Sequence, residues 1–226
     1  MKTNIFILTA FLVLTAFAAN SQSNGVSFGL RGGINFQNIN GKDINGDKLS
    51  MNMVTRFNIG AVVEIPVATD FYVQPGLLFT TKGAKSTDHF LGMDMSAEYN
   101  LSYIEMPVNL LYKPLLGNGH LLLGFGPYLA YAVGGKATFV IENNTTVNDI
   151  VFTKEYESNN PYEYKYFRHF DYGANFLFGY EIAKGISAQL NAQLGLAQIN
   201  ANNTTYPDNK TVFKNTGFGI SLGYNF

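Results

Sequence analysis

The amino-acid sequence predicts an all-β protein, a transmembrane, eight-stranded, antiparallel up-and-down β-barrel. Three observations lead to this class. Long stretches alternate apolar with small polar residues, the chain begins like an exported protein, and only 14% of its residues are charged, against about a quarter in soluble domains. A period of two is typical of a strand that has one apolar face and one polar face.

Eight segments carry the alternation, and they lie at 26–36, 55–65, 71–82, 100–112, 120–133, 166–181, 186–199 and 215–226. The connections alternate between long polar loops, such as 83–98 and 134–165, and short turns, such as 66–70. Short periplasmic turns and long extracellular loops are the layout of a transmembrane barrel, with both ends of the chain on the periplasmic side. Segments of ten or more residues are long enough for a tilted strand to cross a bilayer.

The last predicted strand shows the pattern most clearly. Apolar or aromatic side chains occupy most even positions from Thr216 to Phe226, and Asn, Gly and Ser occupy the odd ones. An aromatic residue at the end of such a strand resembles the assembly signal of bacterial outer-membrane barrels, so we expect the barrel-assembly machinery to recognise the strand ending at Phe226. Taken alone, this segment also fits a half-buried strand of a soluble sandwich.

The N-terminal segment predicts export. Lys2 supplies a positive charge, residues 5–17 are mostly apolar, and small residues follow at possible cleavage sites. This apolar run is too short to span a bilayer as a helix. We expect a cleaved signal peptide at 1–21, an outer-membrane β-barrel domain at 22–226 and a location in the cell outer membrane. The chain has no Cys, which excludes a lipoprotein anchor and disulfides.

A soluble, calycin-like carrier of lipophilic ligands is the main structural alternative. Such a barrel turns its apolar face inward around the ligand and its charged face to water. Here the polar face consists mostly of Gly, Ser, Asn and Gln. These small groups favour a narrow, crowded lumen, with the apolar face turned to lipid.

Charged residues on the polar face form the candidate site, which we interpret as a structural network in the lumen. Its members are Arg31, Arg56, Glu64, Glu105, Asp171 and Glu181. The interior of an eight-stranded barrel is filled by side chains, so buried charges there need partners. The register places Arg31 and Glu105 near mid-strand, and we expect them to pair across the lumen. A gated ion path or a proton site is the functional alternative.

No catalytic residue, metal site or cofactor is predicted. His89, His120 and His169 fall at different positions and lack metal-binding spacing. The Asp-rich segment 43–47 lacks the distal Glu of a calcium loop. A formal net charge of −1 argues against nucleic acid as a partner. We therefore expect a protein that is not an enzyme, although an outer-membrane lipid-modifying enzyme with a His, Ser and acid cluster on one rim remains the alternative.

Aromatic residues near the strand ends predict two interfacial girdles in the bilayer. They are Phe36, Phe71, Tyr112, Tyr131, Tyr166, Tyr180, Tyr224 and Phe226. Four tyrosines fall within the loop 155–167, which either binds partners or folds over the barrel mouth. Eight strands leave no wide pore, so we expect a structural or surface-interaction role through the extracellular loops. Outer-membrane lipid and lipopolysaccharide surround the barrel, and an unidentified surface protein or glycan is the expected partner.

Several short motifs resemble those of the PorT-like outer-membrane barrel family of Bacteroidetes. The segment 103–112, YIEMPVNLLY, is similar to a Y-x-E-[IV]-P-hydrophobic run of that family, and GPYLAY at 126–131, FDYG at 170–173 and GYE at 179–181 look like further signatures in the expected order. The resemblance covers essentially the whole mature chain. It implies an eight-stranded outer-membrane barrel without a defined activity. The founding member is linked to secretion of surface proteins, a role that we do not transfer to this chain.

Overall fold

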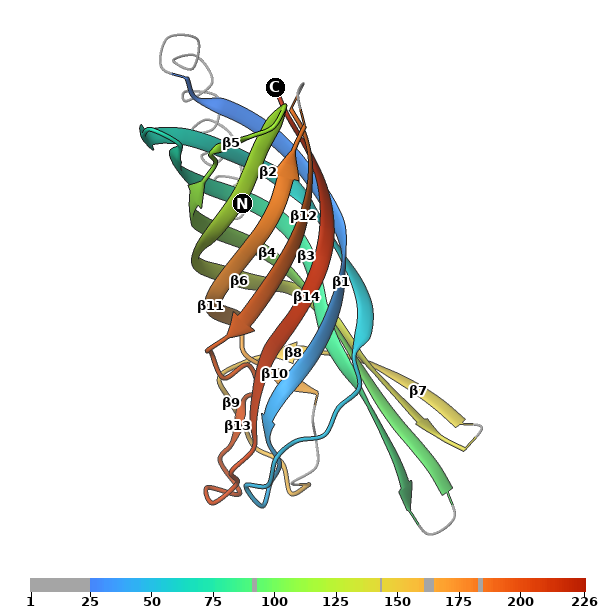
Figure 1. Ribbon diagram of the computed structural model, residues 1–226. Coiled ribbons are helices and arrows are strands. Elements are labelled where there is room, and N and C mark those ends of the chain that lie inside the picture. Colours follow the sequence, from blue (N-terminus) through green and yellow to red (C-terminus); the bar gives the residue numbers. More distant parts are fainter. Residues whose placement is uncertain (1–24, 91–92, 143, 161–164, 183–184) are drawn as a thin grey trace, which may run out of the picture.

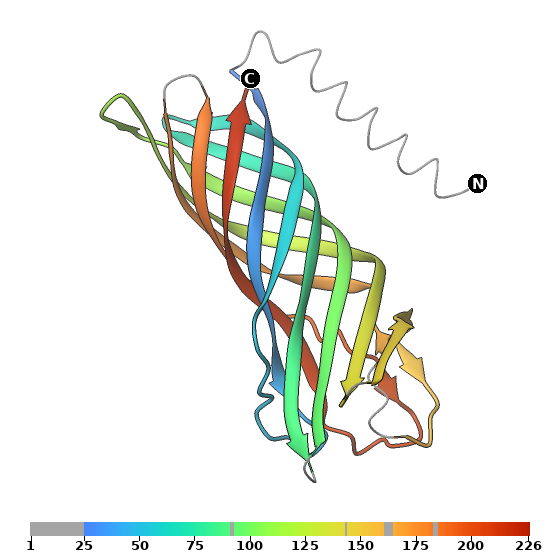
Figure 2. The same cartoon turned by 90° about the vertical axis from the view of Figure 1, so that its right-hand side faces the viewer.

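The protein is a closed eight-stranded β-barrel. The computed structural model describes residues 25–90, 93–142, 144–160, 165–182 and 185–226, so the predicted signal peptide at 1–21 lies outside the described residues. The barrel strands are β1 (Ser27–Lys42), β2 (Val54–Ala68), β3 (Phe71–Phe90), β4 (Met93–Tyr112), β6 (Gly119–Ile141), β11 (Phe170–Glu181), β12 (Ile186–Gly195) and β14 (Val212–Asn225). Each pairs antiparallel with its neighbours, and pairing of β6 with β11 closes the ring (Figures 1 and 2). The predicted fold class is confirmed.

Ring closure matters because a membrane offers no water to unpaired backbone groups. The first and last barrel strands pair with each other from Gly29 opposite Asn225 to Lys42 opposite Val212. Beyond the last strand, the Phe226 amide donates to the Phe28 carbonyl oxygen at 2.7 Å. Both terminal strands therefore meet at the rim that carries the short turns. Among the described residues, no helix is long and apolar enough to cross a membrane.

The two faces of the wall have opposite chemistry. On β1, Leu30 is 57% exposed on the outside, whereas Arg31 is 8% exposed in the lumen. On β14, Phe218 and Ile220 point outward, and Ser221 is buried. A soluble lipophilic carrier would have the reverse arrangement. Glycines make room in the crowded lumen, because a Cβ added at Gly217 would lie 2.7 Å from the Gln37 side chain.

Two predicted loops are instead strands, which corrects the sequence interpretation. Strands β3 and β4 continue to either side of 91–92, and β6 continues to Ile141 before returning as β7 (Asn144–Asp149). The outer halves of β3, β4 and β6 form, with β7, a four-stranded sheet that projects beyond the barrel, which we call the projecting sheet (Figure 1). Its segments lack strong apolar alternation because a strand outside lipid can be polar on both faces.

Other strand ends also differ from the prediction. The expected strand 166–181 is divided into β10 (Tyr166–Phe167) and β11, and the expected strand 186–199 ends at Gly195. Strand β2 extends past Pro66 to Ala68, with an irregularity in its register there. Two short strand pairs link the long loops at the end of the barrel opposite the chain termini. They join β8 (Val151–Phe152) with β10, and β9 (Glu155–Tyr156) with β13 (Asn202–Asn203). The small strand β5 (Leu115–Leu116) lies in the opposite turn region, beside β6.

An apolar cluster fills the lumen at the end that carries the long loops, and we call it the plug. Its members include Ile39, Tyr99, Leu101, Tyr103, Phe167, Ile199 and Phe213, each at most 2% exposed. Phe167 and Ile199 come from the loops that turn inward after the strands end. Their ring and side-chain contacts, such as Tyr99 to Phe167 with centroids 5.6 Å apart, close the extracellular mouth of the barrel.

Candidate functional site

One charged network lies in the lumen next to the plug, and we call it the upper network. Lys82 Nζ lies 2.8 Å from Glu105 Oε2 and 3.0 Å from Asp171 Oδ2. The Tyr128 hydroxyl donates to Asp171 at 3.2 Å, and Asn215 Nδ2 donates to the same carboxylate at 2.9 Å. Lys82 and Asp171 are completely buried. Lys82 Nζ also lies 4.2 Å from the centroid of the Tyr128 ring, a favourable cation–π geometry.

A second charged network lies at the end of the lumen with the short turns, and we call it the lower network. Lys113 Nζ lies 2.9 Å from Glu64 Oε2 and 2.8 Å from Glu181 Oε2. Asn225 Nδ2 donates to both carboxylates, at 3.1 Å and 2.7 Å. The two acids, on β2 and β11, are therefore joined by a lysine from the turn after β4.

Lys113 lies in that turn, outside the barrel strands. Burial by itself lowers the pKa of its ammonium group, but the attraction of Glu64 and hydrogen bonds from Lys113 to Glu181 and Glu64 outweigh burial and raise this pKa above its ordinary value of 10.5.

The two predicted arginines have different positions. Arg31 Nη2 donates to Gln74 Oε1 at 3.2 Å, and Gln74 Nε2 donates to Glu64 at 3.1 Å. Arg56 pairs with Glu98 at 2.9 Å, at the base of the projecting sheet. The expected pair between Arg31 and Glu105 is wrong in detail. Both side chains face the lumen, but Arg31 is linked to the lower network and Glu105 to Lys82.

Sequence reasoning missed the two lysines that organise these networks. Lys82 was placed at the end of a predicted strand and Lys113 at the start of a turn. The alternation indicates that both lysines face the lumen, because residues an even number of positions apart on a strand face the same side. On β3, Lys82 is separated by an even number of positions from the inward Gln74 and Thr80. Lys113 follows the inward Leu111 by two residues. Lys82 therefore already lay on the inward face of the predicted strand 71–82, and extending the strand 100–112 by one residue would have found Lys113.

The two histidines with described side chains, His120 and His169, lie far from each other. His120 pairs with Glu181 in the ladder at the short-turn end. His169 lies at the other end, stacked on Tyr131 with centroids 4.8 Å apart and on Phe152 at 5.1 Å. Its Nδ1 lies 3.3 Å from the Ala132 carbonyl oxygen. The side chain of His89 is outside the described residues. In the described part of the chain, no group of three His, Cys, Asp or Glu residues could hold a metal ion.

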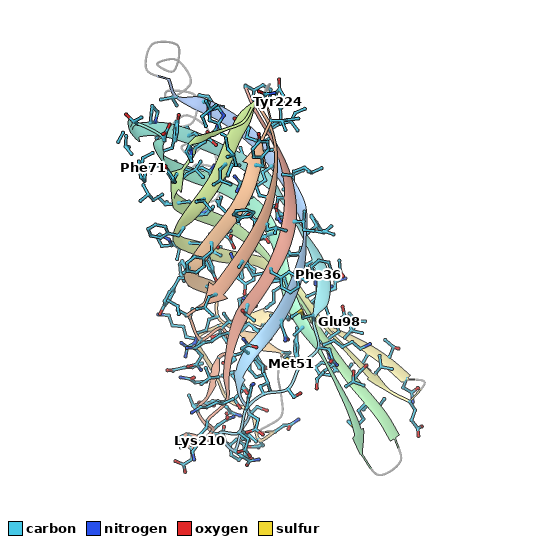
Figure 3. The ribbon with its side chains drawn as sticks, in the orientation of Figure 1. Phe36, Met51, Phe71, Glu98, Lys210 and Tyr224 are labelled. Atoms are coloured by element: carbon cyan, nitrogen blue, oxygen red, sulfur yellow. The ribbon has the colours of Figure 1, made fainter. Side chains whose placement is uncertain are left out.

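Exposed aromatic residues lie toward both ends of the barrel. Phe71 stacks on Tyr112 with centroids 4.8 Å apart, and Tyr224 contacts Phe226 at 5.0 Å, all at the short-turn end. Figure 3 shows Phe71 and Tyr224 at that end and Phe36 much farther along the barrel. Of the other residues expected in the girdles, Tyr131 is 44% exposed near the extracellular rim. Tyr180 donates to the Leu116 carbonyl, and Tyr166 stacks on Tyr156 within the loops.

A groove of about 640 Å³ opens on the extracellular side. One wall is the loop 43–51, and the other consists of residues of β4 and β6 in the projecting sheet. Leu49, Met51, Ala97 and Phe139 give the groove an apolar floor that packs against the plug. Lys48 and Asp43 contribute charges to its lining. In Figure 3, Met51 and Glu98 lie where the projecting sheet leaves the barrel.

The tyrosine-rich loop 155–167 lies over the barrel mouth in its described parts. Glu155 and Tyr156 pair with Asn202 and Asn203, and Phe167 enters the plug. Residues 161–164, which include two of its tyrosines, lie outside the described residues. The described part of this loop therefore folds over the barrel mouth.

The comparison with protein-family models settles the family. Residues 18–201 match the model of the outer membrane protein beta-barrel domain. The chain belongs to this family. The family assignment and the lipid-compatible outer face place the protein in the outer membrane. A search of curated proteins finds no match to this chain.

Three solved structures are similar to this chain at low sequence identity. Ail, the attachment invasion locus protein of Yersinia pestis, was solved in complex with the heparin analogue sucrose octasulfate, and is 11% identical over 89% of this chain and 99% of its own, with a TM-score of 0.38. Neisserial surface protein A is 10% identical over 90% and 100%, with a TM-score of 0.45. OprG from Pseudomonas aeruginosa is 12% identical over 88% and 95%, with a TM-score of 0.40.

Proposed function

We propose that this protein is a surface-exposed barrel that binds a partner through its extracellular groove and projecting sheet, and that it forms no wide pore. The observation that carries the proposal is the groove between loop 43–51 and the projecting sheet, above a lumen that the plug closes. The projecting sheet extends beyond the lipid-facing part of the barrel, so its strands have no role in crossing the membrane. An apolar groove with a charged rim is instead the usual form of a recognition surface.

The partner class is a surface protein or a glycan, including the sugar portion of lipopolysaccharide. We also propose that residues 1–21 form the signal peptide, that residues 22–226 form the barrel domain, and that the protein belongs to the PorT-like branch found in Bacteroidetes. The exposed aromatic side chains of Tyr224 and Phe226 support recognition of the last strand by the barrel-assembly machinery. The lumen charges serve stability, and no cofactor takes part.

Site-specific photo-crosslinking tests the proposal. A photoreactive amino acid at Ser96, which lines the groove, should trap a defined partner on intact cells. The same amino acid at Asn118, exposed in a short turn, is the matched control and should not trap that partner. Equal trapping at both positions, or none at Ser96, would contradict a groove-based function. Planar-bilayer recordings of the purified protein should show no large, stable conductance.

The same proposal treats the protein as a non-enzyme. His120 and His169 lie at opposite ends of the barrel, and the ring contacts of His169 are aromatic. Incubation with lipopolysaccharide or phospholipid, followed by mass spectrometry, should show no turnover. Turnover that the substitution His169→Ala abolishes would replace the binding role with a lipid-modifying one.

A further inference from the structure

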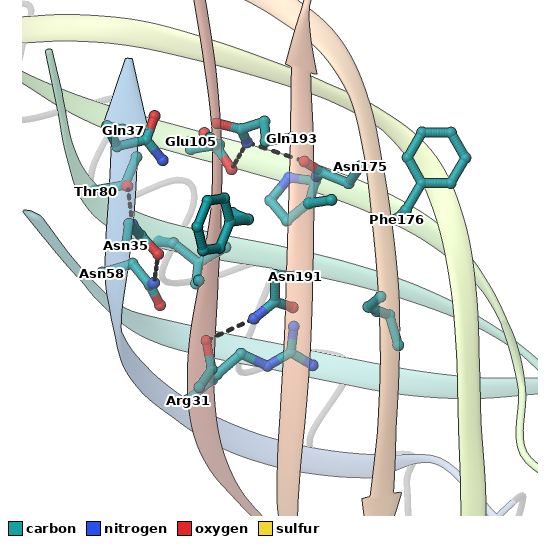
Figure 4. Close-up of a pocket in the computed structure, with 18 of the residues that line it drawn as sticks. Arg31, Asn35, Gln37, Asn58, Thr80, Glu105, Asn175, Phe176, Asn191 and Gln193 are labelled. Carbon is teal, nitrogen blue, oxygen red and sulfur yellow. Dashed lines mark hydrogen bonds between the residues drawn. The ribbon is translucent and has the colours of Figure 1, made fainter. Parts of the chain in front are cut away.

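The cations inside the lumen differ from those on the outer wall. Inside, Lys82 and Lys113 each contact two carboxylates. Arg31 donates to Gln74 and lines a cavity of about 70 Å³ between the two networks, among the amide side chains that Figure 4 shows. The lysines that face outward at the extracellular end of β1 and β14 have no carboxylate partner among the described residues.

The outward faces of β1 and β14 change from apolar to mostly polar beyond one pair of aromatic rings. Phe36 and Phe218, with ring centroids 5.3 Å apart, are the last outward aromatic residues on the two strands. The outward positions that follow hold Asn, Asn and Lys on β1, and Thr, Lys and Val on β14. At about 3.3 Å per residue, Lys214 lies about 13 Å along its strand from Phe218, and Lys42 about 20 Å from Phe36. Both lysines therefore lie just beyond the lipid-facing part of the wall.

A further lysine, Lys48, lies directly opposite Lys42. The two residues form an antiparallel bridge. The backbone hydrogen bonds lie on either side of this pair, from Leu49 N to Gly41 O and within the turn 43–47. A pair without hydrogen bonds of its own has the closest Cα atoms in a sheet, about 4.5 Å apart, and its side chains lie on the same face. Like charges in this position repel each other.

Lys214 lies diagonally across from Lys42, and we call Lys42, Lys48 and Lys214 the outer basic patch. Lys214 pairs with Asn40, two positions before Lys42, and diagonal neighbours on one face of a sheet are about 7–8 Å apart. The acids of the adjacent turn, Asp43 and Asp47, follow the end of β1, and Asp43 accepts two backbone amides of that turn at 2.9 Å. Within the described part of the chain, no ion pair offsets the repulsion among the three lysines.

A negatively charged group bound to the outer basic patch would relieve this repulsion, and the position of the patch indicates which group it is. The patch continues the same outward face that carries the lipid-facing residues. Lysine side chains are long enough to lie along the wall and extend their ammonium groups to the level of the lipid headgroups. The anionic groups at that level are lipid phosphates, which lysine binds as a compact point charge. A free phosphate ion or a soluble acidic protein would make no use of the apolar wall beside the patch.

We propose that the outer basic patch binds the phosphorylated headgroup of a glycolipid of the outer leaflet, the class that includes lipid A. The acyl chains of this lipid lie on the apolar wall, beside Phe36 and Phe218. The bound lipid then covers the seam where the first and last barrel strands pair. Lys42 and Lys214 do not line the groove, so lipid binding at the patch and photo-crosslinking at Ser96 can fail independently.

Native mass spectrometry of the purified barrel in detergent tests the proposal, with bisphosphorylated lipid A, dephosphorylated lipid A and inorganic phosphate as probes. EDTA is present, so that no divalent cation joins phosphates to the acids of the turn 43–47. Bisphosphorylated lipid A should bind about tenfold or more tightly than the dephosphorylated form, and inorganic phosphate at equal concentration should not displace it. Equal affinity for the two lipids would overturn the proposal, and displacement by inorganic phosphate would show a site for a soluble anion instead.

Charge removal at the patch provides the second test. Lys42→Gln combined with Lys214→Gln should weaken the binding of bisphosphorylated lipid A about tenfold or more, and should leave the binding of the dephosphorylated form unchanged. Lys136→Gln combined with Lys154→Gln is the matched control, because it removes the same charge at exposed positions outside the patch. The control should bind like the wild type, and an equal loss in both double variants would refute the patch.

A charge-conserving variant separates electrostatic binding from a change in the wall. Lys42→Arg combined with Lys214→Arg should retain the affinity for bisphosphorylated lipid A, and a loss as large as that of the Gln variant would contradict the proposal. Heat-modifiable migration on gels checks that each variant is folded. If the double Gln variant does not fold, Lys42→Gln alone, at an exposed position at the end of β1, decides the question against Lys136→Gln.

Discussion

Lys82 Nζ lies 3.0 Å from Asp171 Oδ2, although 89 positions separate the two residues in the sequence. The pair spans the lumen from β3 to β11, which are not neighbours in the ring. It connects opposite walls of the barrel at the level where the polar lumen meets the plug. Glu105, on β4, makes the second contact with the same lysine.

Removing Lys82 should destabilise the barrel strongly. Lys82→Met leaves Glu105 and Asp171 buried without their counter-charge, which typically costs about 3–5 kcal/mol. The double variant Lys82→Met with Asp171→Asn should recover part of this loss. Urea unfolding in detergent, followed by circular dichroism, measures both. Lys210→Met, at an exposed loop position, is the control and should leave the midpoint unchanged; no recovery in the double variant would contradict the pairing.

Double-mutant cycles should separate the true partner of Glu105 from the one expected from sequence. Glu105→Gln should show a large coupling energy with Lys82→Met, because the two groups lie 2.8 Å apart. With Arg31→Met the coupling should be much smaller, since Arg31 donates to Gln74 instead. The unfolding free energies of the single and double variants give both values. A larger coupling with Arg31 would show that the pairing inferred from sequence was right.

The plug should exclude reagents that approach from outside. The chain has no cysteine, so an Ala132→Cys variant offers a single thiol at a position 1% exposed within the plug. A membrane-impermeant maleimide should not label it on intact cells. Adding Phe167→Ala should permit labelling, because the lost ring opens a cavity in the mouth. Thr87→Cys, exposed on the projecting sheet, should label in both backgrounds, and fast labelling of Ala132→Cys alone would argue against a closed mouth.

Alkaline pH should weaken the lower network. The pKa of Lys113 is raised above 10.5 in the folded protein, so its stabilising contribution is fully present below 10.5 and is lost as pH rises through the higher folded-state value. The difference in urea midpoint between the wild type and Lys113→Met should therefore be constant from neutral pH to 10.5 and shrink above it. A difference in urea midpoint that grows above pH 10.5 would contradict a raised pKa for Lys113 in the folded protein.

The barrel itself could be predicted from the sequence because lipid imposes a simple rule on each strand. Outward residues such as Leu30 and Phe218 must be apolar, and inward residues must be small or polar, so the alternation identified the crossing part of all eight strands. The same rule located Arg31, Glu64, Glu105, Asp171 and Glu181 inside the lumen. The rule stops at the edge of the lipid, and beyond it the predicted loops 83–98 and 134–165 contain strands of the projecting sheet.

Period-two alternation thus determined which side of the wall each residue faces, the number of strands and the short-turn end of the barrel. Only the tertiary structure decided which lumen residues meet. The side of the wall that a residue faces is a local property of its strand. Contact across the lumen depends instead on the tilt and relative shift of strands that are not neighbours. For this reason the sequence placed Arg31 and Glu105 in the lumen, and the closed ring placed Lys82 between Glu105 and Asp171.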